Sequence, residues 1–258
     1  MRMETIAAAA LSLLLAACVT PEVAPSSVVR ELAPTGKLRA AINFGNPVLA
    51  QRDPFGGVSV DLSRELAKRL RVPVEFVTYD AAGRVTDDAT KNVWDIAFVA
   101  RDPQRAKDLE FTDAYVIIEG AYLVPSSSPL QKNEDVDAPG VRIAVGRGSA
   151  YDLWLSRNIK RATLIRAPTS PAAVDLFAKD RLEVAAGVKQ PLVNYAARHS
   201  GVRMLPGRFM VIEQAMATPR GRPTGAKYLA DFVDEMKASG FVADALQKSG
   251  QKDAAVAP

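Results

Sequence analysis

Short apolar runs alternate with amphipathic stretches along most of the chain after Gly36. Each run has the length of a buried strand, and the runs lie at about 38–44, 74–77, 96–100, 141–145, 163–165 and 184–186. Between the first two runs, Leu62, Leu66 and Leu70 recur at the spacing of one helical face. This alternation predicts an α/β fold with a parallel-type sheet and helices on its faces.

The C-terminal part of the chain predicts two helices in succession. The first spans residues that share one apolar face, namely Leu229, Phe232, Val233 and Met236, and Gly240 ends it. The second covers about 241–248. The last residues, 253–258, are expected to fray.

One stretch, Trp94 to Tyr115, combines a buried strand with a candidate anion site. The strand at 96–100 is followed by Asp102 and Pro103, which are favoured at the N-cap and the first position of a helix. This arrangement predicts a helix with Arg105 in its first turn, where free backbone amides and the helix dipole also attract anions. A solvated arginine on a surface helix is the alternative interpretation.

Composition and charge narrow the possible functions. The chain has 258 residues, of which 48% are hydrophobic and 24% charged, and its formal net charge is +4. Because the basic residues are scattered, no nucleic-acid partner is expected. A single histidine and a single cysteine argue against most metal sites and any internal disulfide, and no cofactor is predicted. His199 lies in the polar sequence AARHSG and is interpreted as a surface residue.

The N-terminal segment indicates export and lipid attachment. Residues 6–17 are apolar but too short to span a bilayer, as in a signal peptide. They end in Leu15-Ala16-Ala17-Cys18, which resembles the bacterial lipobox and implies cleavage before Cys18 and lipidation of that residue. A plain signal peptide is the alternative, and Glu4 departs from the usual positive leading region. Residues 18–35 are expected to be the lipidated cysteine and a Pro- and Ser-containing tether.

The region around Arg105 resembles the signature of family 3 extracellular solute-binding proteins, which serve amino-acid ABC importers. In that family a strand is followed by T-x-x-R and then F-S-x-P-Y. Here Arg105 is followed at the same spacing by the sequence Phe111-Thr112-Asp113-Ala114-Tyr115. The resemblance extends from Gly36 to about Gly250, and it implies that Arg105 clamps the carboxylate of a ligand.

The resemblance also implies a two-lobe fold of the periplasmic binding protein type II kind. Lobe 1 would consist of residues 36–117 and 217–252, and lobe 2 of residues 118–216. Two crossover strands would join the lobes and act as a hinge near Val116–Gly120 and Glu213–Met216. The ligand would lie in the cleft between the lobes.

Matching the family's motifs to this chain gives a set of candidate ligand-binding residues. The G-T-x loop of the family corresponds to Gly148, Ser149 and Ala150, at a predicted helix start. Phe98 and Ala100 lie on the strand that leads to Arg105. Phe44, after the first strand, is a candidate aromatic wall of the cleft, with plain core packing as the alternative.

Two further candidates concern the charge of the ligand. The family's G-R-V-D-A-V-V-x-D-x-P pattern ends in an aspartate that binds the ligand ammonium, but the matching place here holds Val188 or Lys189. A cation there would repel an ammonium group, which argues against a standard α-amino acid. Glu119, a charge inside a strand-like run, is expected near the cleft, with an exposed sheet edge as the alternative.

Together these features predict a monomeric, periplasmic lipoprotein that captures a small anionic solute for an ABC permease and its ATPase. The solute would be an amino acid or an amino-acid-like carboxylate. An enzyme on the same fold, similar to the cyclohexadienyl dehydratases and using Glu119 as its acid, is one alternative. A ligand-sensing accessory lipoprotein is the other.

Overall fold

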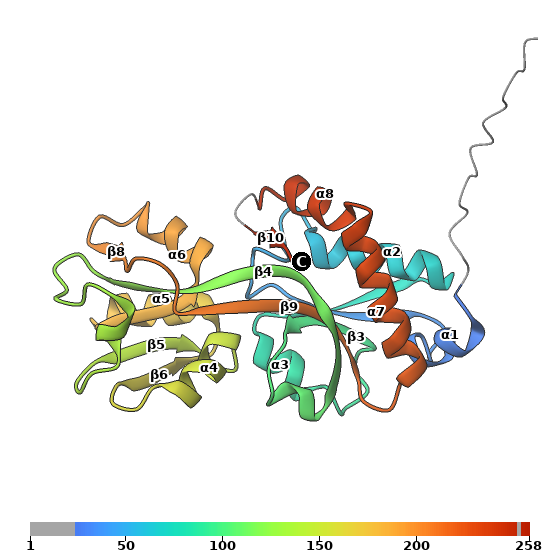
Figure 1. The fold of residues 1–258 in the computed structure, drawn as a ribbon, viewed down its shortest axis with the longest axis horizontal. Coiled ribbons are helices and arrows are strands. Elements are labelled where there is room, and N and C mark those ends of the chain that lie inside the picture. Colours follow the sequence, from blue (N-terminus) through green and yellow to red (C-terminus); the bar gives the residue numbers. More distant parts are fainter. Residues whose placement is uncertain (1–23, 252–253) are drawn as a thin grey trace, which may run out of the picture.

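Two lobes joined by two long strands make up the computed structural model, which describes residues 24–251 and 254–258 (Figure 1). The joining strands are β4 (Leu109–Pro125) and β9 (Met210–Pro219). They pair antiparallel along most of their length, from Leu109 opposite Pro219 to Gly120 opposite Met210. The predicted two-lobe α/β fold with two crossover strands is therefore confirmed.

Lobe 1, on the right of Figure 1, is built around a small parallel sheet. Strand β1 pairs with β2 and β3 in parallel, and β3 pairs antiparallel with β9. Its elements are α1 (Ser26–Leu32), β1 (Leu38–Asn43), α2 (Val58–Leu70), β2 (Val74–Tyr79), α3 (Ala82–Asp87), β3 (Ile96–Ala100), a 3-10 turn η1 (Arg105–Lys107), α7 (Pro223–Ala238) and α8 (Phe241–Lys248).

Lobe 2, on the left of Figure 1, repeats the same layering. Strand β5 pairs in parallel with β6 and β7, and β7 pairs antiparallel with β4. Its elements are η2 (Asn133–Val136), β5 (Arg142–Gly146), α4 (Ala150–Asn158), β6 (Thr163–Ala167), α5 (Ser170–Lys179), β7 (Val184–Val188), α6 (Lys189–Ala196) and β8 (Val202–Met204). The strand order β2-β1-β3-β9-β4-β7-β5-β6 makes one hydrogen-bonded path through both lobes.

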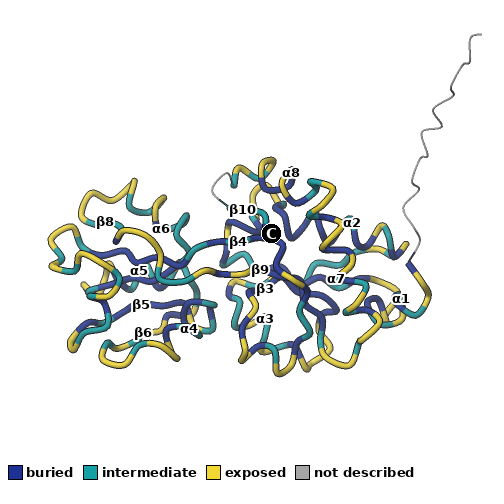
Figure 2. Tube along the Cα trace, in the orientation of Figure 1, coloured by how far each residue is buried: buried dark blue, intermediate teal, exposed yellow. Residues whose placement is uncertain are grey.

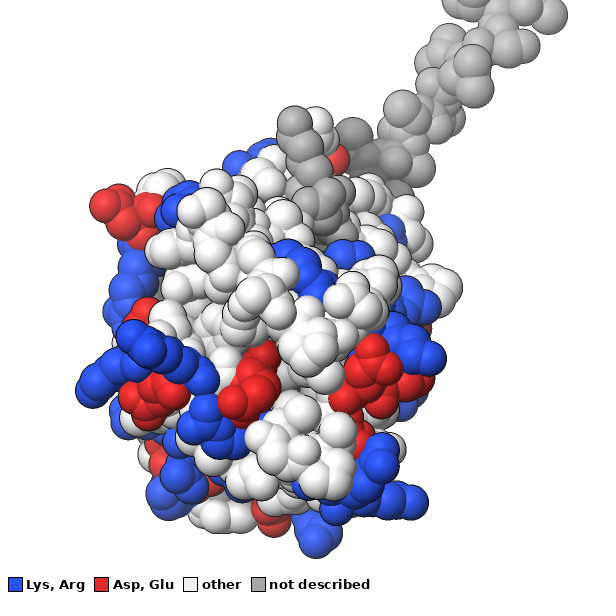
Figure 3. Space-filling model, turned by 90° about the vertical axis from the view of Figure 1, so that its left-hand side faces the viewer, with Lys and Arg blue, Asp and Glu red and all other residues white. Residues whose placement is uncertain are grey.

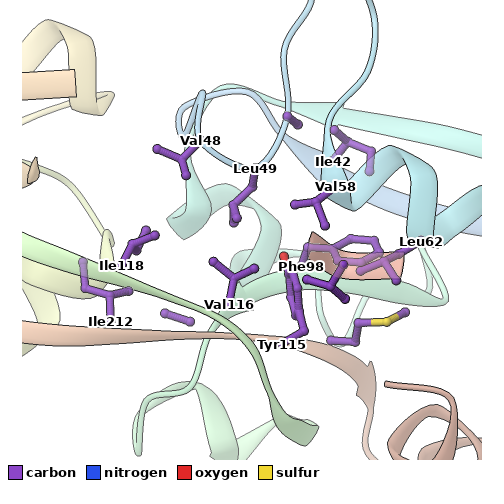
Figure 4. Packing of buried hydrophobic residues seen from close by; sticks show 14 of the residues in the cluster. Ile42, Val48, Leu49, Val58, Leu62, Phe98, Tyr115, Val116, Ile118 and Ile212 are labelled. Carbon is purple, nitrogen blue, oxygen red and sulfur yellow. The ribbon is translucent and has the colours of Figure 1, made fainter. Parts of the chain in front are cut away.

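The hydrophobic core follows this path across the junction. Buried residues lie along the central strands, and exposed residues lie mainly on the outer helices and loops (Figure 2). Figure 4 shows the junction end of the lobe 1 core, where Ile118 of β4 lies beside its pairing partner Ile212 of β9. Phe98 and Tyr115 pack edge to face there, with ring centroids 6.0 Å apart. The crossover strands are therefore part of the core as well as a connection between the lobes.

Charged side chains are mixed in sign on the end of lobe 2 that faces the viewer in Figure 3. Lysine and arginine residues there alternate with aspartate and glutamate around an uncharged surface. No helix among the described residues has the length and apolar character that crossing a membrane requires. The segment predicted to be a signal peptide and the predicted lipidation site, Cys18, lie outside the described residues.

Both ends of the described chain are more ordered than the sequence predicts. The predicted tether contains α1, whose Val28 and Leu32 are buried because they recur four residues apart and pack beside α7. The tail predicted to fray contains β10 (Ala255–Val256), which pairs antiparallel with β4 at Ile117 and Val116. These corrections arise because each segment covers an apolar or hydrogen-bonding surface that only the folded lobe presents.

A buried carboxylate ties three elements of lobe 1 together. The side chain of Asp95 is fully buried and accepts hydrogen bonds from the Nε and one terminal nitrogen of Arg39, at 2.9 and 2.8 Å. It also accepts one from Arg222 at 3.0 Å. Because Arg39 lies on β1 and Arg222 precedes α7, this carboxylate fixes α7 against the sheet.

Replacing Asp95 by alanine would leave two mostly buried guanidinium groups without their counter-charge. We expect Asp95→Ala to lower the free energy of unfolding by about 3–5 kcal/mol, as for other broken buried pairs. Asp113→Ala, which removes an exposed partner of Arg101, is the control and should change stability little. Urea denaturation of both variants measures the difference, and similar losses in the two would contradict this role of Asp95.

Candidate functional site

A small cavity of about 40 Å³ lies between the lobes, beside the crossover strands. This volume has room for only a few water molecules. A larger molecule would therefore enter only when the lobes move apart. Residues of both lobes and of β9 line it, among them Asn43, Asn46, Phe98, Ala100, Arg105, Ser149, Ala150, Tyr151, Ser170, Val188, Ile212 and Gln214.

Arg105 reaches this cavity from a short turn rather than from a helix. The side chain of Asp102 accepts a hydrogen bond from the backbone N–H of Gln104 at 2.8 Å, and one 3-10 turn follows. The predicted α-helix after Asp102 and Pro103 is wrong, because β4 begins at Leu109 and the chain must re-enter the sheet within a few residues. The positive end of a helix therefore contributes nothing to this side of the site.

The guanidinium of Arg105 is held by two backbone carbonyl groups, one from each lobe. One terminal nitrogen donates to the carbonyl of Ala100 at 2.9 Å, and the other donates to the carbonyl of Gly148 in lobe 2 at 2.8 Å. Its Nε is buried and has no hydrogen-bond partner among the described residues. Burial lowers the pKa of Arg105 to about 10, so the side chain still carries its charge at neutral pH.

The turn that contributes Gly148 is shaped by the helix behind it. Ser149 caps α4 by accepting the N–H of Asp152 at 3.0 Å. The carboxylate of Asp152 accepts the N–H of Gly148 at 2.8 Å, and Arg166 donates to the same carboxylate at 2.9 Å. These bonds fix the carbonyl of Gly148 where Arg105 can donate to it.

Two glycines allow the lobes to approach this closely. Gly148 has a φ of +68°, and a Cβ atom there would lie 2.7 Å from the Cα of Gly83. A Cβ atom on Gly83 would in turn lie 3.0 Å from the carbonyl oxygen of Arg147. A larger residue at either position would push the backbones of α3 and lobe 2 apart.

An ion pair between the lobes lies next to these contacts. Arg157 of α4 donates to both carboxylate oxygens of Asp102, at 3.3 and 2.7 Å. Asp102 is buried, whereas the side chain of Arg157 is 42% exposed. The sequence did not indicate this pair, because the two residues are 55 positions apart and belong to different lobes.

Most of the predicted site residues meet at the cavity. Phe98, Ala100, Ser149 and Ala150 line it. Gly148 contributes through its carbonyl bond to Arg105. Their roles toward a ligand remain predictions, but the structure brings segments from both lobes to one place.

Phe44 lies in a neighbouring recess and not in the cavity wall. Its ring packs edge to face with Phe55, with centroids 6.0 Å apart, and the guanidinium of Arg52 lies 4.3 Å from its ring centroid. The recess, of about 390 Å³, also contains Thr169 and Pro171 of lobe 2. Phe44 thus faces the lobe junction from outside the cavity.

Glu119 and Lys189 pair with each other outside the cavity. Lys189 donates to the Glu119 carboxylate at 2.7 Å, and Arg208 donates to its other oxygen at 2.7 Å. The hydrogen bond from Lys189, followed by that from Arg208, lowers the pKa of Glu119. All three residues line a groove of about 430 Å³ beside the crossover strands. The residue that reaches the cavity from this part of lobe 2 is Val188.

Several polar residues of the wall were not predicted from the sequence. They are Asn43, Asn46, Tyr151, Ser170 and Gln214. Asn43 ends a parallel strand, where ligands of α/β proteins commonly bind, and this signal was available. Gln214 is a buried polar residue in a crossover strand. Tyr151 and Ser170 meet through a 2.7 Å hydrogen bond that only the fold creates.

The model of one protein family, the bacterial extracellular solute-binding proteins of family 3, matches residues 46–252. The chain belongs to this family. Its extracellular classification agrees with a location outside the cytoplasm, as the N-terminal segment also predicts. No curated protein sequence matches the chain. In residues 24–251 and 254–258, no group of His, Cys, Asp and Glu side chains is placed to hold a metal ion.

Solved structures show the same fold as this solute-binding protein. A mutant of the ArgBP protein from T. maritima has a TM-score of 0.74 at 18% identity, over 87% of this chain and all of that one. The ancestral amino acid-binding protein AncCDT-1, a precursor of cyclohexadienyl dehydratase, has a TM-score of 0.71 at 22% identity, over 85% and 98%. An amino acid ABC transporter substrate-binding protein from Streptococcus pneumoniae bound to L-arginine has a TM-score of 0.73 at 16% identity, over 89% and 99%.

Removing the ion pair between the lobes should favour an open solute-binding protein. We expect Arg157→Ala to destabilise the closed arrangement relative to the open one by about 1 kcal/mol, which lowers the ratio of closed to open molecules about fivefold. The effect is modest because the arginine is partly exposed. Arg161→Ala is the control, since the contacts of Arg161 with Asp137 use its backbone N–H. Small-angle scattering should show a larger radius of gyration for Arg157→Ala alone. An unchanged radius would contradict a closing role for this pair.

Proposed function

We propose that this protein captures a small carboxylate between its lobes and delivers it to an ABC importer. The observation that carries the proposal is Arg105, a buried cation with a free Nε beside the interlobe cavity. The negative charge of Asp102 acts on Arg105, but no carboxylate of the described residues forms an ion pair with it. A buried cation without such a partner is costly, and a ligand carboxylate is the group that would supply one. The membership in a solute-binding family supports the same role.

Binding would proceed by closure of the two lobes on the ligand. In an open arrangement the carbonyl of Gly148 would move away from Arg105 with lobe 2, and a carboxylate would accept from the exposed guanidinium. Closure would then bring the turn at Ser149, held by Asp152, onto the other side of the ligand. The paired strands β4 and β9 are the elements that would bend.

A dehydratase-like enzyme is less well supported. The acid considered for such a reaction, Glu119, lies outside the cavity and is hydrogen-bonded to two cations. A general acid at neutral pH needs a raised pKa, whereas that of Glu119 is lowered. Turnover of prephenate or arogenate by the purified protein would favour the enzyme instead.

A sensing lipoprotein would use the same cavity, and co-purification with a permease distinguishes transport from sensing.

Arg105→Ala should weaken carboxylate binding at least tenfold, because a charge-assisted hydrogen bond contributes about 1.5–3 kcal/mol. Lys107→Ala, on the exposed side of the same turn, is the matched control and should bind as the wild type does. A thermal-shift screen of carboxylates, amino acids and amines selects the ligand, and calorimetric titration measures its affinity. Equal affinity of the two variants would exclude Arg105 as the anchor.

The location of the protein is part of the same proposal. A lipid on Cys18 would anchor the mature chain to a membrane on the side that faces away from the cytoplasm, next to the importer. One acyl chain alone gives weak attachment, and a lipidated cysteine with several chains gives a stable one. The described body, beginning with α1, would act as a monomer.

Cys18→Ala should abolish lipid attachment and leave the folded body unchanged. The wild type should partition into the detergent phase of a Triton X-114 extract, and the variant should remain in the aqueous phase. Circular dichroism of the two proteins serves as the control for folding. If the variant partitions as the wild type does, the lipid anchor is wrong and the segment is a plain signal peptide.

A further inference from the structure

We propose that the cavity selects small monoanionic acids that carry a hydroxyl or oxo group at the second carbon, in preference to the corresponding amino acids. This inference rests on the proposed capture of a carboxylate and specifies its ligand class. Its basis is the charge of the cavity wall.

The cavity wall has one charge among the described residues. Arg105 is that charge, and the other polar side chains are the neutral residues Asn43, Asn46, Ser149, Tyr151, Ser170 and Gln214. Phe98, Val188 and Ile212 contribute apolar surface. One cation among neutral groups complements one negative charge. It does not complement a zwitterion, whose ammonium needs an anion of its own.

Four carboxylates around the cavity have a cationic partner already. Asp102 is bonded to Arg157 and Asp152 to Arg166. Glu119 lies between Lys189 and Arg208, and Asp80 is paired with Arg52 at the neighbouring recess. A ligand ammonium could use one of these carboxylates only by displacing the partner. Each displacement would break an existing charge-assisted hydrogen bond.

Neutral polar groups suit a hydroxyl or oxo group instead. Gln214 is buried in the middle of β9, and it lines the cavity. An amide offers both donors and an acceptor, so it can bond a hydroxyl or a ketone oxygen equally well. An ammonium would find acceptor oxygens there but no negative charge, and the nearby Arg105 would repel it.

Val188 is the position at which this selectivity can be changed. It ends β7 and directly precedes α6, and it lines both the cavity and the neighbouring groove. The next residue, Lys189, lines the groove, where it bonds to Glu119. A carboxylate introduced at Val188 would neutralise a ligand ammonium in the cavity. The same change at Lys189 would act outside the cavity and break the bond to Glu119.

Matched acids test the proposal on the full mature protein. The probes are three series that differ only at the second carbon: L-lactate, pyruvate and L-alanine; the 2-hydroxy, 2-oxo and amino acids with the leucine side chain; and the same three with the glutamine side chain. Calorimetric titration of the wild type should give at least tenfold tighter binding for the hydroxy or oxo acid than for the amino acid of the series that binds best.

Two variants of Val188 separate charge from shape. Val188→Asp should reduce the preference for the hydroxy or oxo acid over the amino acid at least tenfold, or reverse it. Val188→Asn introduces a side chain nearly identical in shape to aspartate but neutral, and it should keep the preference. The melting temperature of each variant without ligand verifies that it is folded. If Val188→Asp does not fold, the wild-type preference decides the ligand class alone.

Three outcomes would overturn the inference. The first is that an amino acid binds the wild type as tightly as its hydroxy and oxo counterparts and that this binding requires Arg105. This outcome would refute the ligand class but leave carboxylate capture intact. Equal preference in Val188→Asp and Val188→Asn would refute the role of Val188. If no acid of any series binds, both the ligand class and the proposed capture fail.

Discussion

The junction of the two lobes depends on the buried guanidinium of Arg105. It donates to a carbonyl of lobe 1 and to a carbonyl of lobe 2, and its Nε remains free. A charge at such a position is tolerated only where its hydrogen bonds are well made, because desolvation opposes it. The surrounding structure provides these hydrogen bonds. Asp152 orients the turn at Gly148, and Gly148 and Gly83 allow the backbones of the two lobes to approach closely.

The crossover strands connect this site to the rest of the molecule. Because β4 and β9 pair along their length and contribute to one core, bending them moves one lobe relative to the other without breaking either. The short strand β10 adds a second partner to β4 at Ile117, next to the groove that holds Glu119. The C-terminal segment therefore braces the region where the proposed closure would occur.

Arginine pairing determines the electrostatics around the cavity. Arginines pair with three buried aspartates, and each pair has a different role. The pair of Asp95 fixes α7, that of Asp102 joins the lobes, and that of Asp152 supports the turn at Ser149. The pairs of Asp102 and Asp152 keep these two carboxylates from contact with a ligand. What remains at the cavity is a single cation among neutral polar groups, and this is the basis for expecting an anionic ligand.

The sequence by itself determined the strands, most of the helices and the approximate position of Arg105, because apolar periodicity and the order of motifs are local properties of the chain. It predicted a helix after Asp102, where the early start of β4 allows only a 3-10 turn. It left Val188 and Lys189 as alternatives, since strand direction alone does not say which side chain turns inward. The tertiary structure placed Val188 at the cavity and Lys189 on Glu119, and it brought Asp102 to Arg157, because contacts between lobes depend on how two distant surfaces meet.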